Sequence, residues 1–168
     1  MPTEVRRMIR LYKESYEGPA WSGSALKEYL EEFDPEYADL RIDDSYSPYE
    51  LLLHIVQWRE YLIEVLGGED ANERDENMPF PSVEESTEAD WNQAMDKLDA
   101  SQRNILAALE DFPEEKLREA VPGKNFTWYV LLQGIVTHDL YHLGQIVFID
   151  KFAPGDDEDD EEDYEDQD

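Results

Sequence analysis

The segment from Asn125 or Thr127 to about Phe152 constrains the fold most strongly, because it can only form one long helix. It is much longer than a typical strand, and Ala153-Pro154-Gly155 ends it. Its apolar residues occupy much of the helical circumference: Val130, Leu131, Ile135, Val136, Leu140, Leu143, Ile146, Val147 and Phe148. Such a helix is expected to be buried on more than one side, so other elements must pack around it.

Three further segments repeat apolar residues every three or four positions, as amphipathic helices do. The clearest start is the capping box Ser47-Pro48-Tyr49-Glu50, which has proline at the first helical position. We expect these helices from a Thr3 cap to Gly18-Pro19, from Ser47 to Gly67-Gly68, and from a cap within Thr87–Asp90 to Leu109.

The connections between these helices contain shorter elements. Ser24 and Asp34-Pro35 predict the starts of two short helices, and Phe112-Pro113 predicts a further short turn. The polar stretch Glu69–Glu85 has no periodicity and is long for a compact domain. It either carries the chain along the bundle to another position or forms a lid. Strand-like alternation of useful length is absent from the sequence.

The composition divides the chain into a body and an acidic tail. Residues 1–154 are predicted to form one all-α domain, a four-helix bundle with short helices in its connections, and residues 155–168 a disordered tail. The formal net charge is −29, and the 11 acidic residues of 156–168 leave −18 on the rest. A surface this acidic repels phosphate backbones, so we expect no nucleic-acid partner. It suits a halophile with a salt-rich cytoplasm, although ordinary proteins can also be acidic.

Two features that the sequence lacks limit where the protein is expected and which sites it can form. No apolar run reaches the ~18 residues of a membrane span, and the start lacks the apolar stretch of a signal peptide, so a cytoplasmic location and no membrane partner are the default expectations. The chain has no cysteine, which excludes disulfides, thiolate nucleophiles and cysteine-ligated zinc. A metal site would therefore use nitrogen and oxygen ligands.

All three histidines lie in segments built for burial. His138 and His142 are four residues apart, so they project from one face of the last helix, and His54 lies on the inward stripe of the second long helix. Two imidazoles on consecutive turns and a third from a facing helix can hold a divalent metal ion and leave a coordination position open. The alternative is that each histidine is a buried, hydrogen-bonded core residue.

Several residues near this triad also have a functional and a structural interpretation. Gln145 lies near the face of the pair and could orient a ligand or a bound water, or simply join two helices. Asp139 is rotated by ~100° from its neighbour and is expected to support another element rather than a metal. Glu50 is explained by its capping box, and Tyr141 and Trp58 are expected in the core rather than in a substrate pocket.

Three segments of the sequence form a recognisable set: His138-Asp139-Leu140-Tyr141-His142-Leu143-Gly144-Gln145-Ile146, Tyr49-Glu50-Leu51-Leu52-Leu53-His54 and, less specifically, Trp21-Ser22-Gly23-Ser24-Ala25-Leu26. In these segments the chain resembles the DinB/YfiT-like superfamily of metalloenzymes. The resemblance covers most of the chain outside the acidic tail. It implies a four-helix bundle, often a homodimer, with a divalent metal ion such as zinc or nickel on His54, His138 and His142.

The resemblance leaves the reaction open. Characterised relatives include thiol S-transferases and a thiol-dependent isomerase that use a low-molecular-weight thiol. A metal-dependent hydrolase or S-transferase acting on a small molecule is one hypothesis for this chain. The other is a non-enzymatic, metal-binding or stress-related bundle, because a fold does not determine chemistry.

Overall fold

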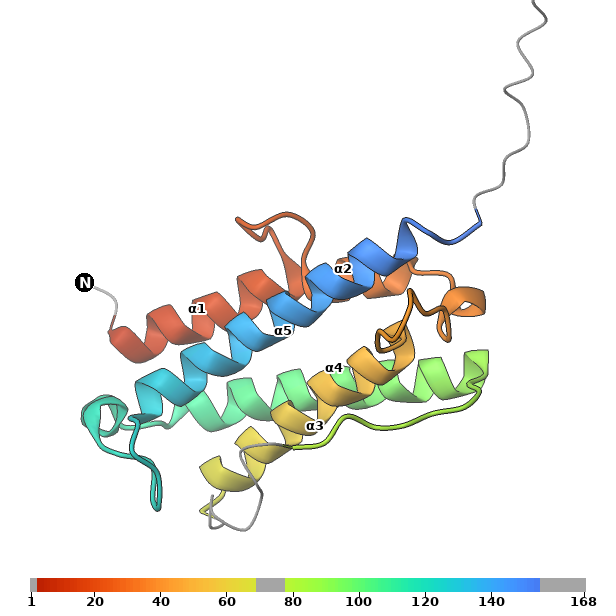
Figure 1. Cartoon of the computed structure of the whole chain (residues 1–168). Coiled ribbons are helices and arrows are strands. Elements are labelled where there is room, and N and C mark those ends of the chain that lie inside the picture. The colour runs from red at the N-terminus through yellow and green to blue at the C-terminus, as the bar shows by residue number, and fades with distance from the viewer. Residues whose placement is uncertain (1–2, 69–77, 155–168) are drawn as a thin grey trace, which may run out of the picture.

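Helices form all the regular structure that the computed structural model describes, over residues 3–68 and 78–154 (Figure 1). The α-helices are α1 (Glu4–Glu17), α2 (Leu26–Glu32), α3 (Pro48–Leu66), α4 (Glu88–Glu110) and α5 (Trp128–Asp150), with 3₁₀ turns η1 (Pro35–Tyr37) and η2 (Glu114–Arg118). The predicted all-α bundle with short connecting helices is confirmed. The predicted disordered tail, 155–168, lies outside the described residues.

The long helices begin at side-chain caps that the sequence predicts. The hydroxyl oxygens of Thr3, Ser47, Thr87 and Thr127 each accept a hydrogen bond from the backbone N–H three residues later. The predicted Ser24 cap is wrong. α2 instead begins after Ala25, whose N–H donates to Glu28 Oε2 at 3.2 Å, so a carboxylate satisfies the helix start without a hydroxyl.

The order of the helices explains the long connection before α4. α3 and α4 run in the same direction, opposite to α1 and α5, so the chain must return along the bundle between them (Figure 1). Residues 78–87 form the last part of this connection before α4. Val83 fixes it to the start of α3, because its N–H donates to Glu50 Oε1 at 3.0 Å and its carbonyl accepts from Arg41 Nη2 at 3.0 Å.

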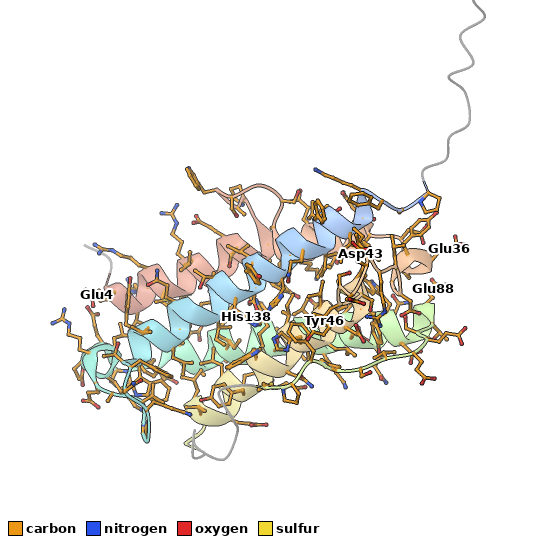
Figure 2. All side chains as sticks on the ribbon, in the orientation of Figure 1. Glu4, Glu36, Asp43, Tyr46, Glu88 and His138 are labelled. Atoms are coloured by element: carbon orange, nitrogen blue, oxygen red, sulfur yellow. The ribbon has the colours of Figure 1, made fainter. Side chains whose placement is uncertain are left out.

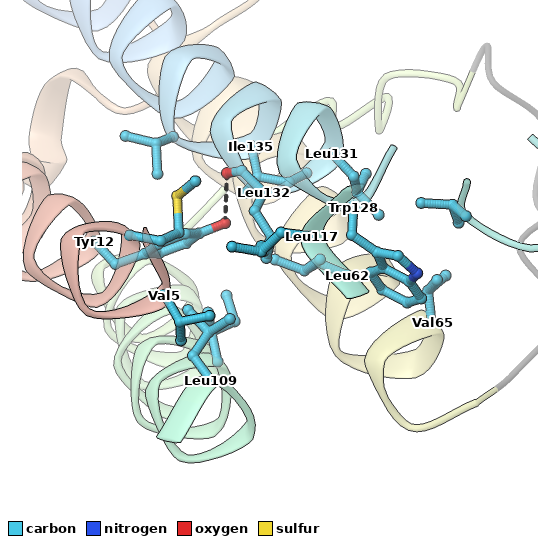
Figure 3. Packing of buried hydrophobic residues seen from close by; sticks show 14 of the residues in the cluster. Val5, Tyr12, Leu62, Val65, Leu109, Leu117, Trp128, Leu131, Leu132 and Ile135 are labelled. Atoms are coloured by element: carbon cyan, nitrogen blue, oxygen red, sulfur yellow. Dashed lines mark hydrogen bonds between the residues drawn. The ribbon is translucent and has the colours of Figure 1, made fainter. Parts of the chain in front are cut away.

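A buried polar layer divides the core into two apolar clusters. One cluster packs the ends of the long helices around Tyr12 and Leu132, and the Tyr12 hydroxyl donates to the Leu132 carbonyl at 2.8 Å (Figure 3). The other packs around Trp91 and Ile146. Between them Arg59 Nε donates to Asp139 Oδ2 at 2.8 Å, and their side chains are only 1% and 3% exposed. The three long helices α3, α4 and α5 all contribute to this layer.

α5 is less enclosed than its apolar sequence predicts. Leu131, Ile135 and Ile146 are buried, but Val130 and Phe148 are more than half exposed. The cause is the arrangement in Figure 1, where α5 lies on an outer face of the bundle. No helix in the described part of the chain has both the length and the apolarity needed to cross a bilayer.

Candidate metal centre

The three histidines meet where α3 crosses α5. One ring nitrogen from each of His54, His138 and His142 lies within 4.8 Å of the others. His54 lies near the start of α3, and because α5 runs in the opposite direction, the late turns of α5 come level with it. Figure 2 shows His138 on the face where these two helices meet. The convergence expected from the spacing is thus present.

Burial keeps two of these imidazoles neutral. His54 and His142 are 4% and 5% exposed. Burial, with a smaller contribution from the neighbouring His138 and His142, lowers the pKa of His54 to about 4. Burial also lowers the pKa of His142, against the opposing effect of Gln145. At neutral pH each of these rings therefore has one unprotonated nitrogen, as the neutral form that binds metal ions does.

Gln145 fixes the orientation of one imidazole. Its Oε1 lies 2.5 Å from His142 Nδ1, so Nδ1 carries the proton and Nε2 carries the lone pair. That Nε2 lies 3.0 Å from His138 Nε2. A hydrogen-bonded partner on the far ring nitrogen is the usual support of a metal-binding histidine. This contact lies within α5, near the face of the histidine pair where the sequence places Gln145.

The two possible tautomers of His138 offer a test of whether a metal ion fits the site. If His138 Nε2 donates to His142, then His138 Nδ1 is a bare lone pair at 3.9 Å from Asp139 Oδ1, and among the described residues both atoms lack a hydrogen-bond partner. If Nδ1 carries the proton instead, it faces a carboxylate, and the Nε2 lone pairs of His138 and His142 face each other. A cation between those lone pairs resolves the conflict, so the donor set fits a divalent metal.

His54 is held by Trp58 and by two stacked rings that the sequence did not reveal. Trp58 Nε1 donates to His54 Nε2 at 3.1 Å, while His54 Nδ1 and the nearby Gln57 Oε1 find no partner in the described part of the chain. The Phe80 ring stacks on His54 with centroids 3.8 Å apart, and Tyr46 stacks on Phe80 at 3.7 Å. Phe80 and Tyr46 lie in irregular segments without periodicity, so no sequence signal indicated them.

The remaining predicted residues lie around the centre rather than in it. Asp139 supports Arg59, as described above. Glu50 serves its capping box, accepting from Ser47 N at 3.0 Å, and pairs with Arg41. The prediction of a core position for Tyr141 is wrong, because its side chain is 64% exposed on the outer face of α5. Trp21 is fully exposed and contributes nothing to the site.

A cavity of about 520 Å³ adjoins the centre, between α5 and the loop before α3. Its lining residues are Ile42, Asp44, Ser45, Tyr46, Leu51, Tyr141, Gly144, Gln145, Phe148 and Ile149. Figure 2 shows Tyr46 on the same side of the bundle as His138. Gln145 thus belongs both to the cavity and to the histidine cluster.

Comparison with known proteins agrees with this fold. No curated protein matches the chain. A crystal structure of a DinB-like protein from Bacillus subtilis, YjoA, is similar, with a TM-score of 0.62 and 20% identity over 86% of this chain and 90% of that one. At this identity the similarity shows the fold alone. The family model of the DinB superfamily matches residues 20–146, a span that contains all three histidines. The chain therefore belongs to the DinB superfamily.

Proposed function

We propose that this protein is a metal-dependent enzyme that acts on a small organic molecule, by hydrolysis or by transfer of a thiol. The observation that carries the proposal is the convergence of His54, His138 and His142, two of them buried and neutral, beside a cavity. These three side chains would hold one divalent ion such as zinc or nickel.

The chemistry would be divided between the ion and the chain. When bound, a divalent ion supplies Lewis acidity, which lowers the pKa of a water or thiol that reaches it. Gln145 keeps His142 Nε2 unprotonated, because its Oε1 accepts a hydrogen bond from the Nδ1–H group. Asp139, anchored by Arg59, offers a carboxylate to His138 Nδ1. Phe80 and Trp58 shield His54 from water.

The alternative is a metal-binding protein without catalytic activity. The Phe80 ring favours it, because stacking on His54 at 3.8 Å covers one side of the cluster. In that case the ion would stabilise the crossing of α3 and α5. A ligand that binds the folded state and not the unfolded state raises the free energy of unfolding.

Parallel activity assays separate the two functions. Zinc-loaded and nickel-loaded protein would be tested with a panel of activated esters and amides, and with electrophiles plus low-molecular-weight thiols. We expect turnover that rises with metal occupancy in one panel and is lost in His138→Ala. A fully loaded protein that is inert in both panels would support the binding function instead.

A further inference from the structure

We propose that the cavity between α5 and residues 42–46 binds a flat, uncharged aromatic group of a small-molecule ligand. As an assignment of the substrate class, this rests on the proposed function. As an assignment of a binding site, it rests on the lining residues alone, whose shape, charge and hydrogen-bonding groups point to the same ligand.

Exposed aromatic side chains surround the cavity. Tyr46, Tyr141 and Phe148 are 46%, 64% and 57% exposed, while Leu51 and Ile149 beneath them are buried. Large apolar side chains that gather around a hollow are typical of ligand sites. Ring faces favour a flat aromatic ligand, because offset and edge-on ring contacts add to the gain from burying apolar area.

The charge of the lining excludes an anion. Its charged side chain is Asp44, and neither Lys nor Arg is present among the described residues that line it. The formal net charge of −29 adds a repulsive field. A carboxylate, sulfonate or phosphate would lose hydration here without gaining a cationic partner. The aromatic group should therefore be neutral.

Gln145 connects the cavity with the histidines and supplies a polar contact. Because its Oε1 accepts from His142 Nδ1, the amide –NH₂ is the group that it offers to a ligand. The ligand should thus carry a hydrogen-bond acceptor. On the opposite wall, Tyr46 reaches His54 through the stacked Phe80 ring. A ligand in the cavity therefore touches Gln145, which contacts His142 directly, and Tyr46, which is linked to His54 through Phe80.

Two glycines of α5 provide a matched pair of variants. A Cβ at Gly144, which lines the cavity, would meet no atom within 4 Å, and the same holds at Gly134, which does not line it. Gly144→Leu fills the cavity from its wall, whereas Gly134→Leu makes the same change elsewhere on the exposed face. Both replace a helical glycine, so both should favour α5.

The test uses 2-naphthamide and 2-naphthoate, which differ mainly in charge, and measures binding to the full chain by calorimetry. We expect wild-type protein and Gly134→Leu to bind 2-naphthamide at least about tenfold more tightly than 2-naphthoate. Gly144→Leu should lose at least about tenfold in affinity for 2-naphthamide. Circular dichroism would verify that both variants are folded.

Several results would overturn the proposal. These are no binding of 2-naphthamide to the wild type, equal binding of 2-naphthoate, or the same loss in both variants. A wild-type dimer that Gly144→Leu converts to monomers, with no naphthamide binding, would show that a second copy covers the cavity.

Metal content, measured on the same samples, separates this proposal from the proposed function. A chain that binds 2-naphthamide without holding metal refutes the enzyme and leaves the binding site in place. A chain that holds metal but does not bind 2-naphthamide refutes the proposed binding site and leaves the proposed enzyme open to its own test.

Discussion

Gln145 determines which nitrogen of His142 is available to a metal ion, through the 2.5 Å contact between its Oε1 and His142 Nδ1. Gln145→Ala removes the acceptor, so the ring can rotate and change tautomer. We predict a metal affinity lower by about 10-fold or more, measured by competition with a chelator. Gln133→Ala, an exposed glutamine on the same helix, is the control and should leave the affinity unchanged. Equal metal affinities in both variants would show that Gln145 does not orient His142 for metal binding.

Glu50 makes the stability sensitive to acid. Burial raises the pKa of its carboxyl, but hydrogen bonds from Arg41 and from the Val83 and Ser47 backbones outweigh burial and lower it to about 2, below its ordinary 4.5. The folded state thus favours the ionised form. Its contribution is fully present above 4.5 and is lost as the pH falls towards 2.

The matching variant is Glu50→Gln, which keeps the capping box and removes the charge. We predict that it lowers the free energy of unfolding by about 3 kcal/mol at neutral pH and that this difference disappears near pH 2. Denaturant unfolding at several pH values measures it. A difference that stays constant with pH would contradict the assignment.

At the level of residues, the sequence predicted the histidine cluster but not its surroundings. A spacing of four places His138 and His142 on one face of any helix, because the geometry is local. The contacts of Phe80, Tyr46 and Arg59 depend on how distant segments meet. No local sequence pattern encodes such tertiary contacts, which explains why these residues were not predicted.

Arg59 and Asp139 join α3 to α5 in the buried polar layer. Removing one charge leaves the other buried without a partner, which is costly. We predict that Asp139→Ala lowers the free energy of unfolding by about 3–5 kcal/mol. Arg59→Met with Asp139→Leu should recover most of that loss, because no charge then remains in the layer. Urea unfolding tests both variants, and a double variant less stable than Asp139→Ala would contradict the argument.

The helices themselves were predictable because their signals are local. Capping hydroxyls at Thr3, Ser47, Thr87 and Thr127 gave four starts correctly. The start of α2 was missed because Glu28 replaced a hydroxyl cap. The exposed face of α5 was missed for another reason, namely that apolarity does not reveal whether a neighbour covers a helix or leaves it free for a ligand.

The whole molecule is strongly acidic, with 43 acidic and 14 basic residues. Repulsion among like charges opposes the compact state, and salt screens it. We predict that the melting temperature rises as sodium chloride increases from low to molar concentration. Potassium chloride should act similarly if screening is the cause. A melting temperature that is flat or falls over this range would refute the hypothesis that the acidic surface is an adaptation to high salt.

The central claim is that three histidines from two helices form one metal site, and metal analysis tests it most directly. Protein purified without an affinity tag, loaded with zinc or nickel and desalted, should hold about one ion per chain, because three convergent imidazoles bind such ions well. His54→Ala, His138→Ala and His142→Ala should each lose most of this occupancy while remaining folded. Full occupancy in any of the three variants, or none in the wild type, would contradict the account.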